Sequence, residues 1–410
     1  MASASAPPRG LIVQKFGGTS VADLGRIRAV ARRVAAARKR WPRVIVVVSA
    51  MAGETDKLLG LAKDLSPTPA GREVDLLLTS GERITSALMA IALDALGVPA
   101  ISLTGGQAGI RTEGDHTRAR VRTIQPGRIQ QELEAGKVVV AAGFQGVDRF
   151  NEETTLGRGG SDLTAVALAA ALEADLCEIY TDVDGVYTAD PRIVPGARRL
   201  ERISFEEMME LASLGAKVLQ PRSVDLAAKY RLPLVVRSSF GEGEGTLITP
   251  ESEGFEAPAV SGVSCDVKQS KLTVIGVPDR PGIASTVFRK LAEKSIVVDV
   301  IVQNVSEGGL TDISITVNQD MAGEAERILR GALPELEASR IQRDDEVAKV
   351  SLVGIGMKSQ AGVASRAFTA LARENVNIMM ISTSEISISV VVREAQAHAA
   401  TRALHQEFVG

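Results

Sequence analysis

An internal repeat in the C-terminal part of the chain restricts its fold more than any other feature. Residues 282–292 align with residues 362–372, 80 positions later, and both copies begin Gly-Ile/Val-Ala-Ser and end Leu-Ala. Each copy follows a short β-branched run and precedes two more, which predicts strand, helix, strand, strand and a further helix. Small units of this kind bury their sheets by packing on each other. The sequence therefore predicts two similar α/β units that share contacts.

The second copy is one strand short. It ends in a predicted helix at Gly410, which leaves no residues for a fourth strand. Residues 260–266 are strand-like, precede the first copy and have no partner there. We expect this run to complete the second unit. The first unit (267–345) would then be inserted within a second unit made of residues 259–266 and 346–410.

Residues 11–249 have a different pattern, in which predicted strands and helices alternate. Helical sequence fills intervals such as residues 82–95 and 162–172. The strands are the apolar, β-branched runs at residues 11–16, 44–49, 100–103, 137–142, 176–180 and 234–237. This alternation predicts an α/β sandwich with a mainly parallel sheet. Residues 1–10 are expected to be a disordered tail and residues 250–258 a linker, because both are rich in small residues and prolines.

The composition argues against several classes of protein. A net charge of −3 does not suit a nucleic-acid-binding surface, which needs a concentrated basic face. No apolar run reaches the roughly 20 residues needed to cross a bilayer, and the first ten residues lack the apolar core of a signal peptide. Cys177 and Cys265 have no metal-ligand spacing and suggest a reducing compartment. We therefore expect a cytoplasmic protein with no membrane or nucleic-acid partner.

Two glycine-rich turns between a predicted strand and a predicted helix are the strongest chemical signal. The first is Lys15-Phe-Gly-Gly-Thr-Ser20, and the second is Leu156-Gly-Arg-Gly-Gly-Ser-Asp162, with Ser161 a candidate helix N-cap. Glycines allow close backbone approach, and free N–H groups at a helix N-terminus favour an anion. Lysine and arginine in these turns suit phosphate and carboxylate. Two such turns fit phosphoryl transfer between anionic substrates, although two plain β–α turns would have the same sequence pattern.

A third segment, residues 180–192, combines carboxylates, tyrosines and an arginine in a loop that follows a strand. Nucleotide binding and a surface turn both fit it. The chain has no Walker-type P-loop and no protein-kinase motif set. Its three histidines are His116, His398 and His405, and the last two are expected on a solvated helix face. Catalysis by a histidine base or by a metal–ligand cluster is therefore not supported.

Taken in order, four segments resemble the aspartate kinases of the amino acid kinase family. They are residues 15–21 (Lys-Phe-Gly-Gly-Thr-Ser-Val), 78–83 (Leu-Thr-Ser-Gly-Glu-Arg), 155–162 (Thr-Leu-Gly-Arg-Gly-Gly-Ser-Asp) and 181–187 (Thr-Asp-Val-Asp-Gly-Val-Tyr). The C-terminal repeats resemble paired ACT domains, which bind amino acids. The resemblance runs from Leu11 to the end and is nearest to the monofunctional enzymes. It implies a three-layer α/β amino acid kinase sandwich with a mainly parallel sheet, followed by two ferredoxin-like βαββαβ ACT domains.

The activity that the resemblance implies is transfer of the ATP γ-phosphoryl group to the β-carboxylate of L-aspartate, the first step of lysine, threonine and methionine biosynthesis. By motif, the implied catalytic residues are Lys15, Asp162 and Lys217. The implied ATP-binding residues are Lys15, Gly17, Gly18, Thr181, Asp182, Tyr187, Arg192, Lys217 and Val218. The implied aspartate-binding residues are Ser49, Thr55, Glu82, Arg158 and Ser161. Mg²⁺ is expected to arrive bound to ATP, with no protein side chains as ligands.

The chemistry of these residue types agrees with that reaction. Arg158 can bind the α-carboxylate, Glu82 can pair with the α-ammonium, and the free β-carboxylate is already ionised at neutral pH, since its reference pKa is about 3.9. No general base is required. Asp162 is expected to orient Lys15. Catalysis would then consist of alignment and charge neutralisation.

The ACT resemblance also implies effector sites for lysine and/or threonine. The implied residues are Asp279, Gly282, Ile283, Ala284, Gln303 and Asn304 in the first repeat, and Val363, Ala364, Asn377, Ile378, Ser384 and Glu385 in the second. Related chains often have His-Pro where this chain has Gln360-Ala361, which leaves the effector of the second pocket open. A β–α turn without a ligand is the alternative at each position.

ACT domains usually pair across subunits, so the resemblance implies a homo-oligomer of two or more chains, and some relatives add a separate regulatory subunit. Two other functions remain open at this point. One is another amino acid kinase that acts on a different carboxylate. The other is a non-catalytic sensor, against which the intact Lys15, Arg158, Asp182 and Lys217 argue. A bifunctional enzyme with a dinucleotide-binding domain does not fit the length of 410 residues.

Overall fold

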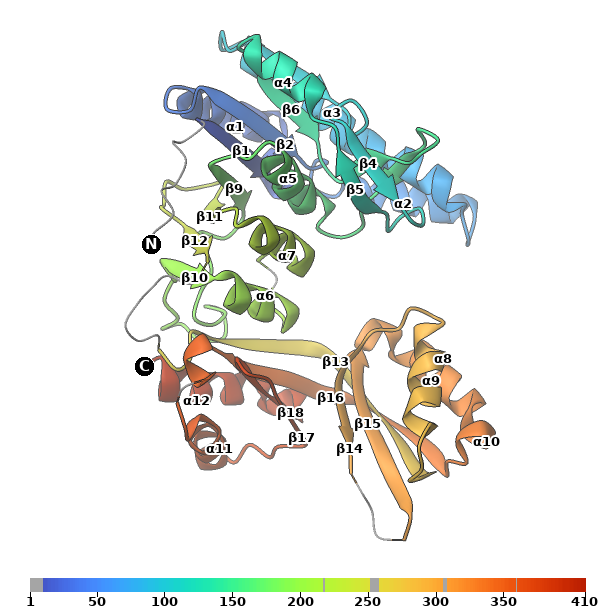
Figure 1. Cartoon of the computed structure of the whole chain (residues 1–410). Coiled ribbons are helices and arrows are strands. Elements are labelled where there is room, and N and C mark those ends of the chain that lie inside the picture. Colours follow the sequence, from blue (N-terminus) through green and yellow to red (C-terminus); the bar gives the residue numbers. More distant parts are fainter. Residues whose placement is uncertain (1–9, 217, 251–257, 305–307, 359) are drawn as a thin grey trace, which may run out of the picture. The chain divides into compact units, whose positions relative to one another are not determined.

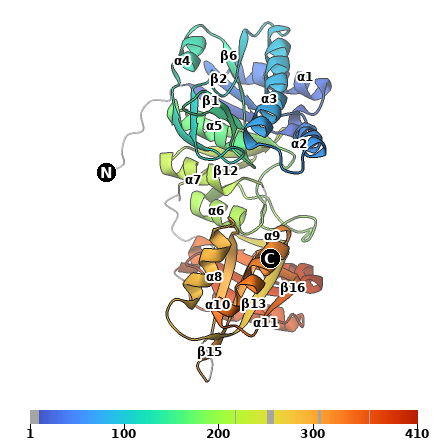
Figure 2. The same ribbon diagram turned by 90° about the vertical axis from the view of Figure 1, so that its right-hand side faces the viewer.

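The computed structural model describes residues 10–216, 218–250, 258–304, 308–358 and 360–410 (Figure 1). The described chain forms two compact units (Figures 1 and 2). The first unit contains the described residues up to Val186, then Arg199–Ser213 and 218–250. The second unit contains Tyr187–Arg198, Leu214–Ala216 and all described residues from 258 onwards.

An eight-stranded sheet forms the centre of the first unit, with the strand order β10-β12-β11-β9-β1-β2-β6-β3. Its strands are β1 (Leu11–Phe16), β2 (Arg43–Val48), β3 (Ala100–Leu103), β6 (Val138–Ala142), β9 (Leu176–Thr181), β10 (Arg202–Ser204), β11 (Leu234–Ser238) and β12 (Thr246–Thr249). Neighbours run parallel except β11 and β12. The central strands β1, β2 and β6 are buried almost throughout, as expected for a parallel sheet covered on both faces. The predicted mainly parallel sheet is confirmed.

Helices cover both faces of this sheet and make the unit a three-layer sandwich. They are α1 (Leu24–Arg38), α2 (Glu54–Leu65), α3 (Gly71–Asp94), α4 (Gly127–Glu134), α5 (Gly160–Ala171), α6 (Phe205–Ser213) and α7 (Pro221–Tyr230), with a 3-10 turn at Gly18–Val21. Ile12 and Phe16 of β1 pack with Ile27 of α1 and Met89 of α3. Alternate residues of a strand face opposite sides, so Lys15 faces the other layer, where it pairs with Asp162 of α5.

A second, four-stranded sheet in the same unit was not predicted. Its order is β5-β4-β7-β8, and its strands are β4 (Ile110–Glu113), β5 (Arg120–Ile124), β7 (Gln145–Val147) and β8 (Glu153–Thr155). Each strand has three to five residues, and β5 is largely exposed. Strands this short are too brief to show an alternating pattern in the sequence.

The second unit is built on one six-stranded sheet with the order β14-β15-β13-β16-β18-β17, in which all neighbours are antiparallel. Its strands are β13 (Gly262–Pro278), β14 (Val298–Gln303), β15 (Leu310–Asn318), β16 (Arg340–Val353), β17 (Met380–Thr383) and β18 (Ser387–Arg393). Its helices are α8 (Ile283–Ala292), α9 (Gln319–Gly331), α10 (Leu333–Leu336), α11 (Val363–Arg373) and α12 (Ala397–Phe408), with 3-10 turns at Ile355–Lys358 and Glu394–Gln396. Two of these strands, β13 and β16, run through both repeats.

The first part of β13 supplies an edge to the second repeat. Gly262–Asp266 pairs with the end of β16, which in turn pairs with β18, whereas the later part of β13 pairs with β15. Val260 and Val263 belong to the hydrophobic core formed by α11 and α12. The helices of the first repeat, α8 and α9, have a separate core. The pairing is therefore the one that the unpaired run at residues 260–266 predicts.

A segment from the N-terminal half also packs into this second core. Ala189 and Val194 are buried there, and Val263 donates a backbone hydrogen bond to Thr188 O at 2.7 Å. His405 is 3% exposed and its Nε2 lies 2.9 Å from Thr188 Oγ1. The expectation that His405 lies on a solvated face is therefore wrong. Burial, with the nearby Arg198, lowers its pKa.

Two predicted helix starts also differ from the structure. Ser161 is not the N-cap of α5. That position belongs to Gly159, whose φ of +74° a glycine adopts without strain. Helix α3 begins at Gly71, well before the predicted residue 82, because an apolar stripe continues upstream through Val74 and Leu78.

Candidate functional site

The two glycine-rich turns lie where four parallel strands end. Lys15 and Phe16 end β1, Ser49 follows β2, Gly143 follows β6 and Thr181 ends β9. These strands are neighbours in the sheet, so their carboxyl ends meet at one edge. Ligands of open α/β sheets bind at this edge.

Lys15 and Asp162 form an ion pair at the centre of this edge. Their Nζ and Oδ1 atoms are 2.6 Å apart, and both side chains are almost buried. Asp162 lies in the first turn of α5, so the carboxylate holds the lysine beside that turn. A Cβ on Gly17 would lie 3.4 Å from Lys15 Nζ. The glycine therefore leaves space for the ammonium group and for an anion beside it.

Close packing brings the serines of the site toward the same edge. The Ser49 N–H donates to Phe16 O at 3.1 Å, and the Gly143 N–H donates to Val48 O at 2.9 Å. A Cβ on Gly143 would lie 2.8 Å from Ser161 Oγ, closer than real side chains approach. Gly143 thus allows Ser161 to sit against the end of β6. Ser49 is half-buried and Ser161 is buried.

Glu82 is a buried carboxylate beside this edge. It lies on α3, is 3% exposed, and accepts a hydrogen bond from Ala50 N–H at Oε1, at 3.1 Å. Its Oε2 has no hydrogen-bond partner among the residues that the structure describes. Burial raises the pKa of Glu82 to about 7. A buried carboxylate with an unused oxygen is suited to bind a cation.

The Arg158 turn depends on glycines. Gly157 and Gly159 have φ of +76° and +74°. A Cβ on Gly159 would lie 1.9 Å from Gln220 Cγ on the residue before α7, so no other residue fits this position without a shift. The Arg158 side chain is exposed at the tip of the turn. It can therefore reach a ligand in front of α5.

The other predicted nucleotide residues that the structure describes are divided between the two units. Thr181 ends β9 and donates from Oγ1 to Asp182 Oδ1 at 2.9 Å. Val218 belongs to the first unit, whereas Lys217 lies outside the described residues. Tyr187 and Arg192 belong to the second unit, with which residues 187–198 pack. Arg192 forms an ion pair with Asp190, with 2.6 Å between Nη2 and Oδ2. Thr55 lies half-buried in the first turn of α2.

Five of the predicted effector residues lie at the starts of α8 and α11 (Gly282, Ile283, Ala284, Val363 and Ala364), and the others lie in loops or at strand ends. Gly282 and Gly362 are the N-caps of these helices, with φ of +100° and +88°. Ile283, Ala284, Val363, Ala364 and Ile378 pack into the two repeat cores. Asp279, Gln303, Asn304, Asn377, Ser384 and Glu385 are exposed. The apolar members thus belong to the two repeat cores, and the polar members are exposed.

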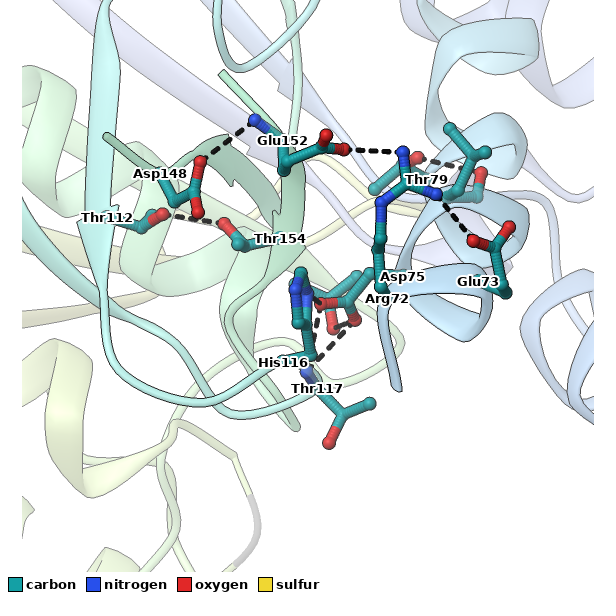
Figure 3. Close-up of polar contacts among 12 residues, drawn as sticks. Arg72, Glu73, Asp75, Thr79, Thr112, His116, Thr117, Asp148, Glu152 and Thr154 are labelled. Carbon is teal, nitrogen blue, oxygen red and sulfur yellow. Dashed lines mark hydrogen bonds and ion pairs between the residues drawn. The ribbon is translucent and has the colours of Figure 1, made fainter. Parts of the chain in front are cut away.

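Asp75 is a buried acid in the first unit that sequence reasoning missed. Asp75 of α3 is fully buried, and its carboxylate contacts His116 and Thr117 (Figure 3). It also accepts a hydrogen bond from Thr155. The signal in the sequence was an aspartate between the apolar Val74 and Leu76 in a helix. Such an acid has to find donors when the helix is buried.

Searches for a metal site and for membrane-spanning helices were limited to the described residues. Within them, no three His, Cys, Asp or Glu side chains are placed to hold a metal ion. Helix α3 is the one described helix with the length and composition to cross a membrane, but half of its apolar window is buried within the protein. Its buried face carries Asp75 and Glu82. This pattern is that of a core helix.

Comparison with protein families gives three matches. Residues 10–238 match the amino acid kinase family, and residues 271–333 and 350–408 each match an ACT domain. These matches confirm the fold class expected from the sequence.

Individual proteins are similar along almost the whole chain. An aspartate kinase of Stutzerimonas stutzeri is 54% identical over 399 residues, which cover 97% of each chain. The crystal structure of E. coli aspartokinase III in complex with aspartate and ADP has a TM-score of 0.81 and 28% identity, covering 98% of this chain and 100% of that chain. The same enzyme in complex with lysine and aspartate has a TM-score of 0.77 at 28% identity, with the same coverage.

Proposed function

Since the chain belongs to the amino acid kinase family, we propose that it is an aspartate kinase that transfers the γ-phosphoryl group of ATP to the β-carboxylate of L-aspartate, giving 4-phospho-L-aspartate and ADP. The observation that carries this proposal is Glu82, a buried carboxylate with one unused oxygen beside two glycine-rich turns. That oxygen is suited to an ammonium group, which distinguishes an amino acid from other carboxylates.

In this proposal the two ends of aspartate are recognised by opposite charges. Glu82 pairs with the α-ammonium, and Arg158 binds the α-carboxylate in a bidentate manner. Ser49, Thr55 and Ser161 complete the site with hydroxyl groups. The β-carboxylate then points toward the phosphate. It attacks the γ-phosphorus as an anion, the bond from phosphorus to the bridging oxygen breaks, and the electron pair leaves with ADP.

The phosphoryl group is held by the first glycine-rich turn. Lys15, kept in place by Asp162, contributes a positive charge, and Gly17 and Gly18 allow the phosphates to approach the backbone. We assign the second phosphate lysine to Lys217 by motif. The rest of the nucleotide is assigned to Thr181, Asp182, Tyr187, Arg192 and Val218.

Mg²⁺ is proposed to enter with ATP and to neutralise charge on its phosphates. Asp182, the carboxylate assigned to the nucleotide, accepts a hydrogen bond from Thr181. We assign no protein side chain as a direct ligand of this metal.

The second unit is proposed to regulate the first. Lysine is bound in one complex of E. coli aspartokinase III, and we propose it as an effector of this chain, with threonine as a further candidate. We propose the domain boundaries stated above, a homo-oligomer formed through the ACT domains, and a cytoplasmic location. A separate regulatory subunit is a further proposal.

Trapping of the product tests this function. The protein is incubated with Mg-ATP and either aspartate, glutamate or N-acetylglutamate, and hydroxylamine converts any acyl phosphate to a hydroxamate. We expect hydroxamate with aspartate, and less of it after lysine or threonine is added. Hydroxamate with another acid alone would make the chain a different amino acid kinase. Rates that do not respond to effectors would remove only the regulatory part.

A further inference from the structure

We propose that Asp75 is a positioning residue that fixes the distance between the two groups that recognise aspartate, Glu82 and Arg158. This inference rests on the proposed function. It concerns a residue that lies outside the substrate site and acts through its neighbours.

Asp75 is the meeting point of three segments that are distant in sequence. It lies on α3, two turns before Glu82, and is fully buried. Its carboxylate accepts from the Thr117 N–H at 3.0 Å to each oxygen and from Thr155 Oγ1 at 2.5 Å. The Nδ1 of His116 lies 2.8 Å from Oδ2. Figure 3 shows His116 and Thr117 converging on this carboxylate.

Thr155 connects Asp75 to the arginine turn. It is the last residue of β8 and stands three residues before Arg158. Its carbonyl accepts from the Ala119 N–H at 3.0 Å, which joins it to the loop that carries Thr117. A Cβ on Gly157 would lie 3.4 Å from Thr117 O, so that loop also touches the turn itself. One buried carboxylate thus ties the helix of Glu82 to the strand that leads into the Arg158 turn and to the loop that touches Gly157.

This arrangement requires both oxygens of a carboxylate. A carboxylate only accepts hydrogen bonds, so the Nδ1 of His116 carries the proton. An amide in place of Asp75 would keep one accepting oxygen and present an NH₂ group to surrounding donors. The amide would therefore lose the hydrogen bond from Thr155 or the hydrogen bonds from His116 and Thr117. Either loss would weaken the connection between α3 and the Arg158 turn.

Thr154, the buried threonine next to Thr155 on β8, provides a matched comparison. Thr154 and Thr112 have their Oγ1 atoms 2.7 Å apart, and both are buried (Figure 3). Thr154 also lies 3.2 Å from Gly146 O. These contacts stay within the small sheet and do not reach α3. Loss of the Thr154 hydroxyl therefore disturbs the same strand without affecting the tie to Glu82.

The test compares Thr155→Val, which removes only the hydroxyl, with Thr154→Val as the control and Thr155→Ser as the rescue. Steady-state rates are measured by the hydroxamate assay with aspartate and ATP varied separately, and melting temperatures are measured in parallel. We expect Thr155→Val to raise the KM for aspartate about tenfold or more, with kcat and the KM for ATP within about twofold of wild type. Thr155→Ser and Thr154→Val should keep the wild-type KM for aspartate, although Thr154→Val lowers the melting temperature.

Variants of His116 provide an independent test of the same proposal. His116→Ala removes the donor and should raise the KM for aspartate, whereas His116→Asn places an N–H near the position of Nδ1 and should restore it. If Asp75→Asn does not fold, the Thr155 and His116 variants still decide the question.

An unchanged KM for aspartate in Thr155→Val would overturn the proposal, as would an equal rise in Thr154→Val or a parallel fall of kcat and rise of both KM values. A wild-type protein that forms no hydroxamate with aspartate and shows no aspartate binding by calorimetry would instead overturn the proposed function, and the positioning role with it.

Discussion

Burial of a single acid, Glu82, sets the pH range in which the proposed site can work. The pKa of Glu82 is about 7 in the folded protein, above its ordinary value of 4.5, because the carboxylate is desolvated. Only the ionised form can pair with the ammonium group of aspartate. Below about pH 7 we therefore expect kcat/KM for aspartate to fall by about tenfold per pH unit. A rate profile from acidic to alkaline buffer checks this, and a profile that is flat through neutral pH would contradict it.

The same burial makes the folded protein more stable at acidic pH, where the activity is expected to be low. Because the folded pKa is raised, the contribution of Glu82 to stability is fully present below pH 4.5 and is lost as the pH rises through about 7. Glu82→Gln should therefore raise the free energy of unfolding more at pH 8 than at pH 5.5. The full effect is about 3 kcal/mol at most, since tenfold in proton affinity corresponds to ~1.4 kcal/mol. Denaturant titrations at both pH values measure it, and an equal effect at both would refute the assignment.

Lys15 and Asp162 combine a catalytic role with a structural one. Lys15→Ala should lower kcat by about two to three orders of magnitude, because a group that stabilises the transferred charge is lost. It should also lower stability, because Asp162 stays buried without its partner. Adding Asp162→Ala should recover stability and leave kcat low. Recovery of kcat in the double variant would show that Lys15 does not act on the phosphate.

At the scale of elements, we expect the turn before α5 to tolerate substitution poorly. Gly159 and Gly97 have the same φ of +74°, but a Cβ on Gly159 would lie 1.9 Å from Gln220 Cγ, whereas a Cβ on Gly97 would have no atom within 4 Å. Gly97→Ala should cost only backbone strain, about 1 kcal/mol. Gly159→Ala should cost more and should also raise the KM for aspartate, since Arg158 moves with the turn. Equal losses of melting temperature with unchanged KM values would contradict this.

The elements that the sequence predicts well are those with a clear apolar pattern. The strands β1, β2, β3, β6, β9 and β11 and the repeated helices α8 and α11 fall in this group. The small sheet β5-β4-β7-β8 does not, because its strands are too short to show a period. Other features depend on contacts between residues that are distant in the sequence. His405 has the sequence setting of a surface residue, but it is buried and contacts Thr188, which lies more than 200 residues earlier in the chain.

The candidate site was predictable in part for the same reason. Lys15, Arg158 and Ser161 stand in glycine-rich turns, which are visible in a sequence. Asp75 is not visible in this way, because its partners lie about 40 and 80 residues away and only the fold brings them together.

At the scale of the whole molecule, the chain passes between the two units five times, at residues 186/187, 198/199 and 213/214, between 216 and 218, and between 250 and 258. Ala189 and Val194 are buried in the core of the second repeat. A fragment ending at residue 250 would expose them. We expect this fragment to be much less soluble than the full chain and not to be an unregulated kinase. Its yield after expression and its thermal unfolding check this, and a soluble, active fragment would contradict it.

The register of β13 and β16 has a consequence for how such a chain can change over evolution. Asp266 pairs with Lys349 and Gln269 pairs with Val347. The two ends of the inserted repeat therefore lie beside each other on the paired strands β13 and β16. A module whose two ends meet can be duplicated, exchanged or deleted by a genetic event without stretching the backbone around it. The inserted repeat is therefore free to acquire a new ligand while its host keeps its shape.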